Sequence, residues 1–245
     1  MVTKPRFDER VPASSPPRLP SPVALHQSWR NVIFVHWAVA PEAVSELYPP
    51  GTQPDTWSGL TYVGLVGFSV PRTTLPGGLP VGGTYEVNVR LYSRDGSGRQ
   101  GVVFRSMDVT RPDMVMVARL LPHLPYMWAS VEPVRPSPSA WGYRVVRRFP
   151  SGLRGRVEVD VDPRPVRGTQ LERFCTARWG LHTRAGSMTA WIPVTHQPWS
   201  LYRGRLRHAD VSFLVAAGAP LPEREPVSVL WSPGVDADVG RPALA

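Results

Sequence analysis

Cysteine and lysine are almost absent from this chain of 245 residues. Cys175 is the only cysteine, so the chain can form neither an internal disulfide nor a cysteine-based zinc site. The chain also lacks the roughly 18–20 consecutive apolar residues that a membrane-spanning helix needs, and the short apolar block of a signal peptide. We therefore expect a cytoplasmic protein without a membrane partner.

The motifs that most directly reveal an enzyme class are missing as well. The sequence contains no H-E-x-x-H, no G-x-x-x-x-G-K-S/T, no G-x-S-x-G, and no G-x-G-x-x-G between a strand and a helix. Zinc-protease, P-loop, dinucleotide-binding and α/β-hydrolase functions therefore have no support. The six histidines are scattered along the chain, and we expect neither a metal site nor a cofactor.

Apolar residues, in contrast, are plentiful. They make up 42% of the chain, with nine Trp, seven Tyr and seven Phe, which is enough to build a globular core. A length of 245 residues is close to the upper limit for one such core. We predict a disordered proline-rich tail over residues 1–22, a single domain over residues 23–236, and a C-terminal tail over residues 237–245.

Short β-type runs dominate the domain. A capping box at Thr169–Glu172 predicts a helix that ends near Gly180, Asp210 is a candidate N-cap for a second short helix, and the turn at Ala185-Gly186 suggests a hairpin. We therefore expect a β-rich α+β domain of antiparallel strands, closed as a barrel or as paired sheets. The expected strands are 32–39, 60–70, 84–92, 101–109, 114–119, 126–131, 141–149, 153–162, 181–184, 187–194, 199–207 and 226–231, with a helical turn at 41–48.

The strand over residues 84–92 carries an unusual polar row. Because alternate residues of a strand share a face, Glu86, Asn88 and Arg90 stand together, opposite an apolar row that includes Val87 and Val89. Either the polar row faces solvent, or it lines a pocket that binds a small oxygen-rich ligand. The preceding Gly/Pro-rich loop, residues 71–83, is a candidate lid and favours the second interpretation.

A series of short motifs occurs in order from about Trp29 to Asp236. They include F-V-H-W at 34–37, P-E-A-V-S-E-L-Y-P-P-G at 41–51, Y-E-V-N-V-R-L-Y at 85–92, G-V-V-F-R-S-M-D at 101–108, L-P-Y at 124–126, F-C-T-A-R-W-G at 174–180, H-Q-P-W at 196–199 and W-S-P-G-V-D at 231–236. Together these motifs resemble the YqjF-like family of bacterial proteins, which belongs to the acetoacetate decarboxylase-like superfamily. This resemblance implies a cone-shaped antiparallel β-barrel with a few short helices and a ligand site inside the barrel.

The chain departs from the named enzyme at its central residue. An acetoacetate decarboxylase needs a lysine that forms a Schiff base with a keto acid, and the only lysine here, Lys4, lies in the predicted tail. The resemblance aligns Tyr126 with that lysine, and a phenol can donate a hydrogen bond or a proton but cannot form an iminium. The resemblance also gives Glu86 a role as acid or base.

These arguments name Glu86 and Tyr126 as candidate catalytic residues of a lyase, isomerase or hydrolase that acts without a Schiff base. The candidate ligand-binding residues are Asn88, Arg90, Arg119, His36 and His196. His36 lies in an apolar strand, which favours a core histidine over a ligand-binding one, and His196 can hold a turn. Arg119 and Arg178 stand in apolar contexts, where a guanidinium needs a carboxylate or a ligand anion. The expected partner is a small molecule, and a homo-oligomer is left open.

The charge of the chain offers an alternative to this hypothesis. Residues 142–208 carry 13 basic and 4 acidic side chains and so hold the excess behind the net charge of +9. An Arg-rich interaction protein could bind a polyanion or another protein through this segment, with the barrel merely structural. The sequence motifs of nucleic-acid readers are absent, which argues against a nucleic-acid partner.

Overall fold

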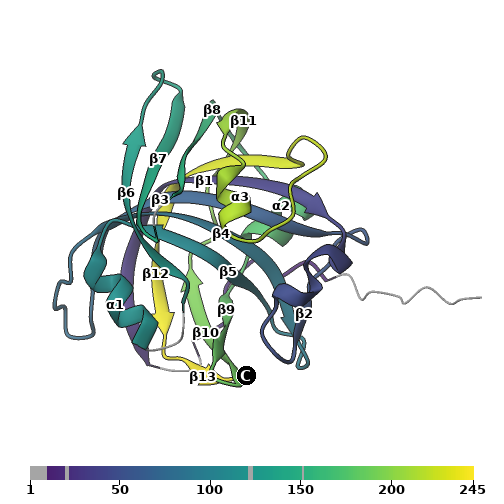
Figure 1. The fold of residues 1–245 in the computed structure, drawn as a ribbon, viewed down its shortest axis with the longest axis vertical. Helices are drawn as coiled ribbons and strands as arrows, with labels where there is room; N and C mark the ends of the chain where they lie inside the picture. Colours follow the sequence, from purple (N-terminus) through teal and green to yellow (C-terminus); the bar gives the residue numbers. More distant parts are fainter. Residues whose placement is uncertain (1–9, 20–21, 121–123, 151) are drawn as a thin grey trace, which may run out of the picture.

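A β-sheet forms most of the computed structural model, which describes residues 10–19, 22–120, 124–150 and 152–245 (Figure 1). The helices are η1, a 3₁₀ helix over Pro41–Leu47, and α1 (Pro112–Leu120), α2 (Gln170–Thr176) and α3 (Ser212–Ala216). The strands in these ranges are β1 (Val23–Val39), β2 (Thr52–Pro54), β3 (Thr61–Thr74), β4 (Thr84–Asp95), β5 (Gln100–Val109), β6 (Tyr126–Val134), β7 (Ala140–Phe149), β8 (Arg154–Val166), β9 (Gly180–Ala185), β10 (Met188–His196), β11 (Leu201–Ala209), β12 (Ser228–Gly240) and β13 (Ala243–Leu244).

The strand pairings close on themselves. From β1 the ladder runs through β3, β4, β5, β9, β10 and β12 and returns to β1, which makes a ring of strands. A second path from β5 to β12 runs through β6, β7, β8 and β11. The β-rich α+β class predicted from the sequence is confirmed, but not every pairing is antiparallel: β5 pairs in parallel with both β6 and β9. For β6 the reason is α1, because a crossover of this kind allows the chain to return in the same direction.

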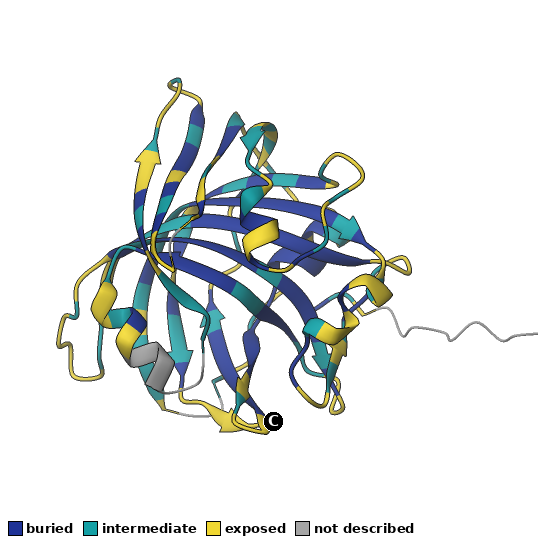
Figure 2. Ribbon diagram, viewed as in Figure 1, coloured by how far each residue is buried: buried dark blue, intermediate teal, exposed yellow. Residues whose placement is uncertain are grey.

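The main hydrophobic core lies between β1, β3 and β4 on one side and β6, β7 and β8 on the other. The apolar face of β4 packs with β1 and β3 against β6, β7 and β8, and α3 covers the same cluster through Phe213 and Leu214. Figure 2 shows β3 and β4 as largely buried, whereas the loops that connect the strands are mostly exposed. The cluster also includes Val87, Val89, Leu91, Val35, Val63, Leu65, Val131, Tyr143, Val145, Val157 and Val159.

One predicted strand and one predicted helix cap are wrong. Residues 114–119 form a helix rather than a strand, because Pro112 begins α1 and Asp113 places an acidic group in its first turn. Asp210 does not cap α3; its carboxylate accepts a hydrogen bond from the backbone amide of Arg156 instead. The hairpin of β9 and β10 is confirmed, with Gly186 at φ 62° in its turn.

The segments predicted as tails are partly described. Backbone carbonyls of Arg10 and Ala13 accept hydrogen bonds from the side chains of Gln100 and Trp179. At the other end, β12 continues beyond residue 236 to Gly240. No helix within the described ranges is both long and apolar enough to cross a membrane.

The capping box at the start of α2 forms as predicted. The Thr169 hydroxyl accepts the amide of Glu172, and the Glu172 carboxylate accepts the amide of Thr169. Thr169→Ala should therefore lower the free energy of unfolding by about 1 kcal/mol, measured by urea denaturation. Thr169→Ser keeps the acceptor and should retain most of the stability; equal losses in both variants would show that the hydroxyl does not stabilise the helix.

Candidate functional site

A cavity of about 250 Å³ lies inside the ring of strands. Its wall is mostly aliphatic and aromatic, and the polar side chains on it are few. Such a wall excludes water and strengthens the electrostatic interactions of the groups that remain. The polar or charged residues that line it are Gln27, Glu86, Asn88, Arg90, Tyr126, Thr176, Arg178 and His196.

Strand β4 supplies the central polar row of the cavity. Glu86, Asn88 and Arg90 all line it, while Val87 and Val89 belong to the core on the opposite face. The structure therefore brings these three predicted residues together on one wall. The solvent-facing arrangement of the row does not occur, since Glu86 is 5% and Asn88 2% exposed.

Glu86 is held by a neighbour on its own strand. The side-chain amide of Asn88 donates to Glu86 Oε1 at 2.8 Å, and Oε2 has no hydrogen-bond partner among the described residues. Burial raises the pKa of Glu86 to about 7, although the Asn88 bond and the charge of Arg90 oppose the shift. Arg90, the other charged residue of this row, forms no ion pair with Glu86.

Tyr126 reaches the same cavity from β6. Asn88 pairs with Met107 across β4 and β5, and Met107 pairs with Tyr126 across β5 and β6, so the three lie in one row. Burial, and secondarily the charge of Glu86, raises the pKa of the Tyr126 phenol well above its ordinary value. The phenol is therefore a neutral hydrogen-bond donor on the cavity wall.

Two arginines form the basic part of the cavity wall. Arg90 donates to the Cys175 carbonyl at 3.3 Å and to the Tyr92 hydroxyl at 3.4 Å, and no described carboxylate pairs with it. Arg178 donates to the Phe174 carbonyl and to Asp55, and its Nη2 is buried without a hydrogen-bond partner in the described part of the chain. The sequence indicated that Arg178 needs an anion, but it did not identify Asp55 as that partner.

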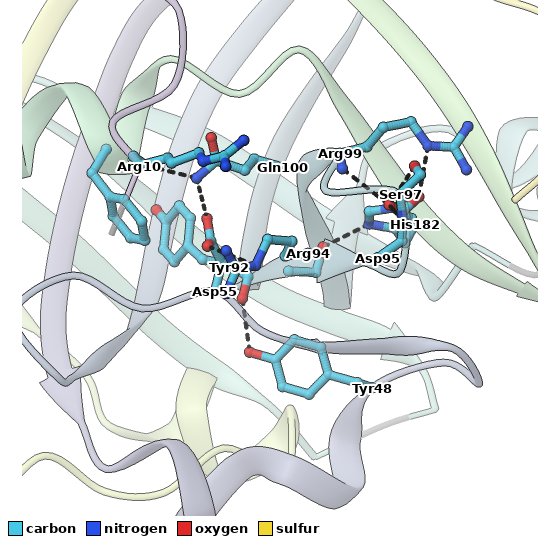
Figure 3. A network of polar contacts seen from close by, with 12 residues as sticks. Arg10, Tyr48, Asp55, Tyr92, Arg94, Asp95, Ser97, Arg99, Gln100 and His182 are labelled. Carbon is cyan, nitrogen blue, oxygen red and sulfur yellow. Dashed lines mark hydrogen bonds and ion pairs between the residues drawn. The ribbon is translucent and has the colours of Figure 1, made fainter. Parts of the chain in front are cut away.

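Asp55 connects this arginine to the N-terminal segment. Its Oδ2 accepts hydrogen bonds from Arg178 at 2.6 Å and from the Gln100 amide at 2.8 Å, and that amide also donates to the Arg10 carbonyl. Figure 3 shows Gln100 between Asp55 and Arg10, with Arg94 on the other side of the carboxylate. Arg178 and Asp55 are each 2% exposed, so the network fixes a guanidinium at the cavity wall.

The remaining predicted residues have different positions. His196 lines the cavity, donates from Nδ1 to the Gln197 carbonyl, and has its pKa lowered to about 4, chiefly by burial. His36 is fully buried but does not line the cavity; it stacks on Phe34, which does, and burial lowers its pKa well below the ordinary value. Arg119 lies in α1, and its side chain is outside the part that the structure describes.

Two other expectations concern the surface. Residues 71–83 are all described, and none of them lines the cavity, so the structure gives the candidate lid no support.

Of the thirteen arginines between residues 142 and 208, seven form ion pairs with carboxylates, which reduces the charge available to a polyanion. Arg205 and Arg207, for example, share Asp160.

Comparisons with known proteins agree with the resemblance seen in the sequence. Residues 26–236 match the family DUF2071, described as "Uncharacterized conserved protein". The "Uncharacterized protein YqjF" of Bacillus subtilis (strain 168) is 24% identical over 211 residues, which cover 83% of this chain and 85% of that protein.

Solved structures with a similar fold are acetoacetate decarboxylase-like proteins. The acetoacetate decarboxylase of Legionella pneumophila has a TM-score of 0.63 at 14% identity and covers 94% of this chain and 91% of its own. The enduracididine biosynthesis enzyme MppR complexed with pyruvate has a TM-score of 0.62 at 17% identity, covering 92% and 91%. At these identities the comparison establishes the fold and not the chemistry.

Proposed function

The chain belongs to the DUF2071 family of conserved proteins, and we propose that its cavity binds a small carboxylate- or carbonyl-bearing molecule. The ring of strands and the fold neighbours support a cone-shaped barrel of the acetoacetate decarboxylase-like type. MppR, one of those neighbours, is complexed with pyruvate, a small keto acid.

The observation that carries this proposal is the Arg90 guanidinium, which lines the cavity and has no carboxylate partner among the described residues. A ligand carboxylate would supply the counter-charge and a charge-assisted hydrogen bond. Arg178 adds a second positive charge on the same wall. Because the surrounding wall is apolar, the attraction between these guanidinium groups and an anion is screened less than it would be in water.

The other polar group of the cavity suits proton transfer. A carboxyl group with a pKa near 7 is both a usable acid and a usable base at neutral pH, and Oε2 of Glu86 has no partner among the described residues. Tyr126 would donate a hydrogen bond to an oxygen on which charge develops. Together they suit a lyase, isomerase or hydrolase that transfers a proton on a bound acid.

A Schiff-base mechanism does not fit this cavity. The residue aligned with the decarboxylase lysine is Tyr126, which lines the cavity, and Lys4 lies outside the described residues. A phenol cannot form the iminium on which decarboxylation of a keto acid through a Schiff base depends. The proposed chemistry therefore differs from that of an acetoacetate decarboxylase, although the fold is shared.

Binding should depend on Arg90. We expect small carboxylic acids to raise the Tm of the wild-type protein, and Arg90→Met to weaken their binding by about 10- to 100-fold, since a charge-assisted hydrogen bond is lost. Arg90→Met should not change the binding of the matching neutral amides, which carry no charge for the guanidinium to attract. Arg164→Met, which replaces an exposed arginine, is the control variant. If no carboxylic acid binds, or if both variants behave alike, the proposed site is wrong.

The same samples test the absence of a Schiff base. Borohydride added with a keto acid should give no covalent adduct on the folded domain, as measured by mass spectrometry of proteolytic peptides. An adduct on the N-terminal amine or on Lys4 is compatible with the proposal. A reduced adduct on any residue between 23 and 236 would contradict it.

A further inference from the structure

Five aromatic side chains form one continuous wall of the cavity. Trp29 stacks on Trp199 at 6.2 Å between ring centroids, and Phe34 meets Trp199 edge-on at 5.2 Å. Phe68 contacts Trp29 at 5.8 Å, and His196 contacts Trp199 at 4.6 Å. All five line the cavity. An apolar wall needs no rings, because aliphatic side chains exclude water equally well, so this concentration of flat surfaces favours a flat ligand.

The aromatic wall is held in a fixed arrangement. The indole of Trp199 donates to the Thr176 carbonyl at 3.1 Å, and the indole of Trp29 donates to Gln27 Oε1 at 2.9 Å. Each of the two indole rings therefore has one polar anchor. Preformed rings bind a planar group without an ordering cost of their own, which strengthens binding.

This wall adjoins the basic part of the cavity. The Arg90 guanidinium lies 5.6 Å from the centroid of the Phe34 ring, which is one of the five. A carboxylate bound at Arg90 and Arg178 would therefore direct the body of its molecule along the rings. Arg90 and Glu86 are four residues apart on β4, and four residues of a strand span roughly 13 Å. The basic part and the Glu86 end are therefore separate regions of the cavity wall.

The Glu86 end of the cavity offers acceptors. Asn88 uses its amide N–H on Glu86, so its oxygen Oδ1 remains, buried and without a partner within the described residues. Oε2 of Glu86 is a second acceptor on the same row. Acceptors that lie close together are satisfied by a hydroxyl or amino group and are repelled by a carbonyl oxygen.

We propose that the ligand of this cavity is an aromatic carboxylic acid whose ring carries a hydroxyl or amino group on the side away from the carboxylate. This inference rests on the proposed function, because it assumes that an anion binds at Arg90 and Arg178. It adds a flat ring along Trp29, Phe34 and Trp199, and a hydrogen-bond donor that Glu86 accepts.

Four probe molecules separate these features. Isothermal titration calorimetry with 4-hydroxybenzoate, benzoate, cyclohexanecarboxylate and pyruvate compares a ring with a donor, a flat ring, a puckered ring and a small keto acid. We expect 4-hydroxybenzoate to bind most tightly, and benzoate to bind at least about 10-fold more tightly than cyclohexanecarboxylate, since an aromatic pair contributes roughly 0.5–1.5 kcal/mol beyond its buried area and a puckered ring also fits the wall poorly.

Three variants connect the preferences to residues. Trp29→Leu should remove most of the preference for benzoate over cyclohexanecarboxylate, whereas Trp141→Leu should not, because Trp141 stacks on Trp231 and does not line the cavity. Glu86→Leu should remove the advantage of 4-hydroxybenzoate over benzoate and leave benzoate binding in place. The last result would show that the variant still folds and binds the anion.

The outcomes distinguish this inference from the proposed function. If pyruvate binds as tightly as benzoate, or if benzoate and cyclohexanecarboxylate bind equally, the aromatic ligand is excluded while the anion site remains. If 4-hydroxybenzoate binds the wild-type protein no more tightly than benzoate does, or if Glu86→Leu leaves its greater affinity unchanged, the hydrogen-bond donor on the ligand ring is excluded. If none of the four acids binds, the proposed function fails and this inference fails with it.

Discussion

Asp55→Ala is expected to lower the free energy of unfolding by about 3–5 kcal/mol, because it leaves the Arg178 guanidinium buried without its counter-charge. The pair is 2% exposed on both sides, so water cannot replace the carboxylate. Gln100 loses an acceptor in the same variant. An effect of this size is a large fraction of the stability of a typical domain and should be evident in urea denaturation.

Two controls separate the buried charge from other effects of removing a side chain. Asp162→Ala breaks an exposed pair with Arg164 and should change the stability by less than about 0.5 kcal/mol. The double variant Asp55→Leu/Arg178→Met removes both charges and should recover much of the loss. If Asp55→Ala is no more harmful than Asp162→Ala, Arg178 does not depend on this carboxylate.

The polar row of β4 could be predicted because it depends on local geometry. Alternation along a strand is fixed by the backbone, so Glu86, Asn88 and Arg90 had to share a face. The sequence could not show that this face lines a cavity, because that depends on the order of the strands around the ring. The Asp55–Arg178 pair could not be predicted from local pattern, because 123 positions separate the two residues and Asp55 directly follows β2, a strand of only three residues.

The helix over residues 112–120 shows where local pattern misleads. The sequence M-V-M-V reads as a strand by its β-branched alternation, but the chain needs a crossover there because β5 and β6 run in parallel. Pro112 at the first helical position was the available signal. The same crossover brings Tyr126 into register with Met107 and Asn88. The mispredicted segment is therefore the one that positions Tyr126, a candidate site residue.

Glu86 and His196 should give the stability opposite dependences on pH within one cavity. The pKa of Glu86 is about 7 in the folded protein and 4.5 in an exposed chain, so the folded state holds more protons between these values and stability falls as pH rises through them. The pKa of His196 is about 4 against 6.5, so stability is lost as pH falls from 6.5 towards 4. The two contributions partly cancel in the wild-type protein.

Glu86→Gln removes the contribution of Glu86 to the pH dependence of stability and keeps an acceptor for the Asn88 amide. The remaining pH dependence should then show the contribution of His196. The free energy of unfolding of the variant relative to wild type should rise by about 3 kcal/mol between pH 4 and pH 8, because each pKa unit corresponds to about 1.4 kcal/mol. Urea denaturation at one-unit pH intervals measures this difference, with Glu225→Gln at an exposed position as the matched control. A difference that stays constant with pH would mean that Glu86 ionises as freely in the fold as in the unfolded chain, and its proposed role as acid and base near neutral pH would then be lost.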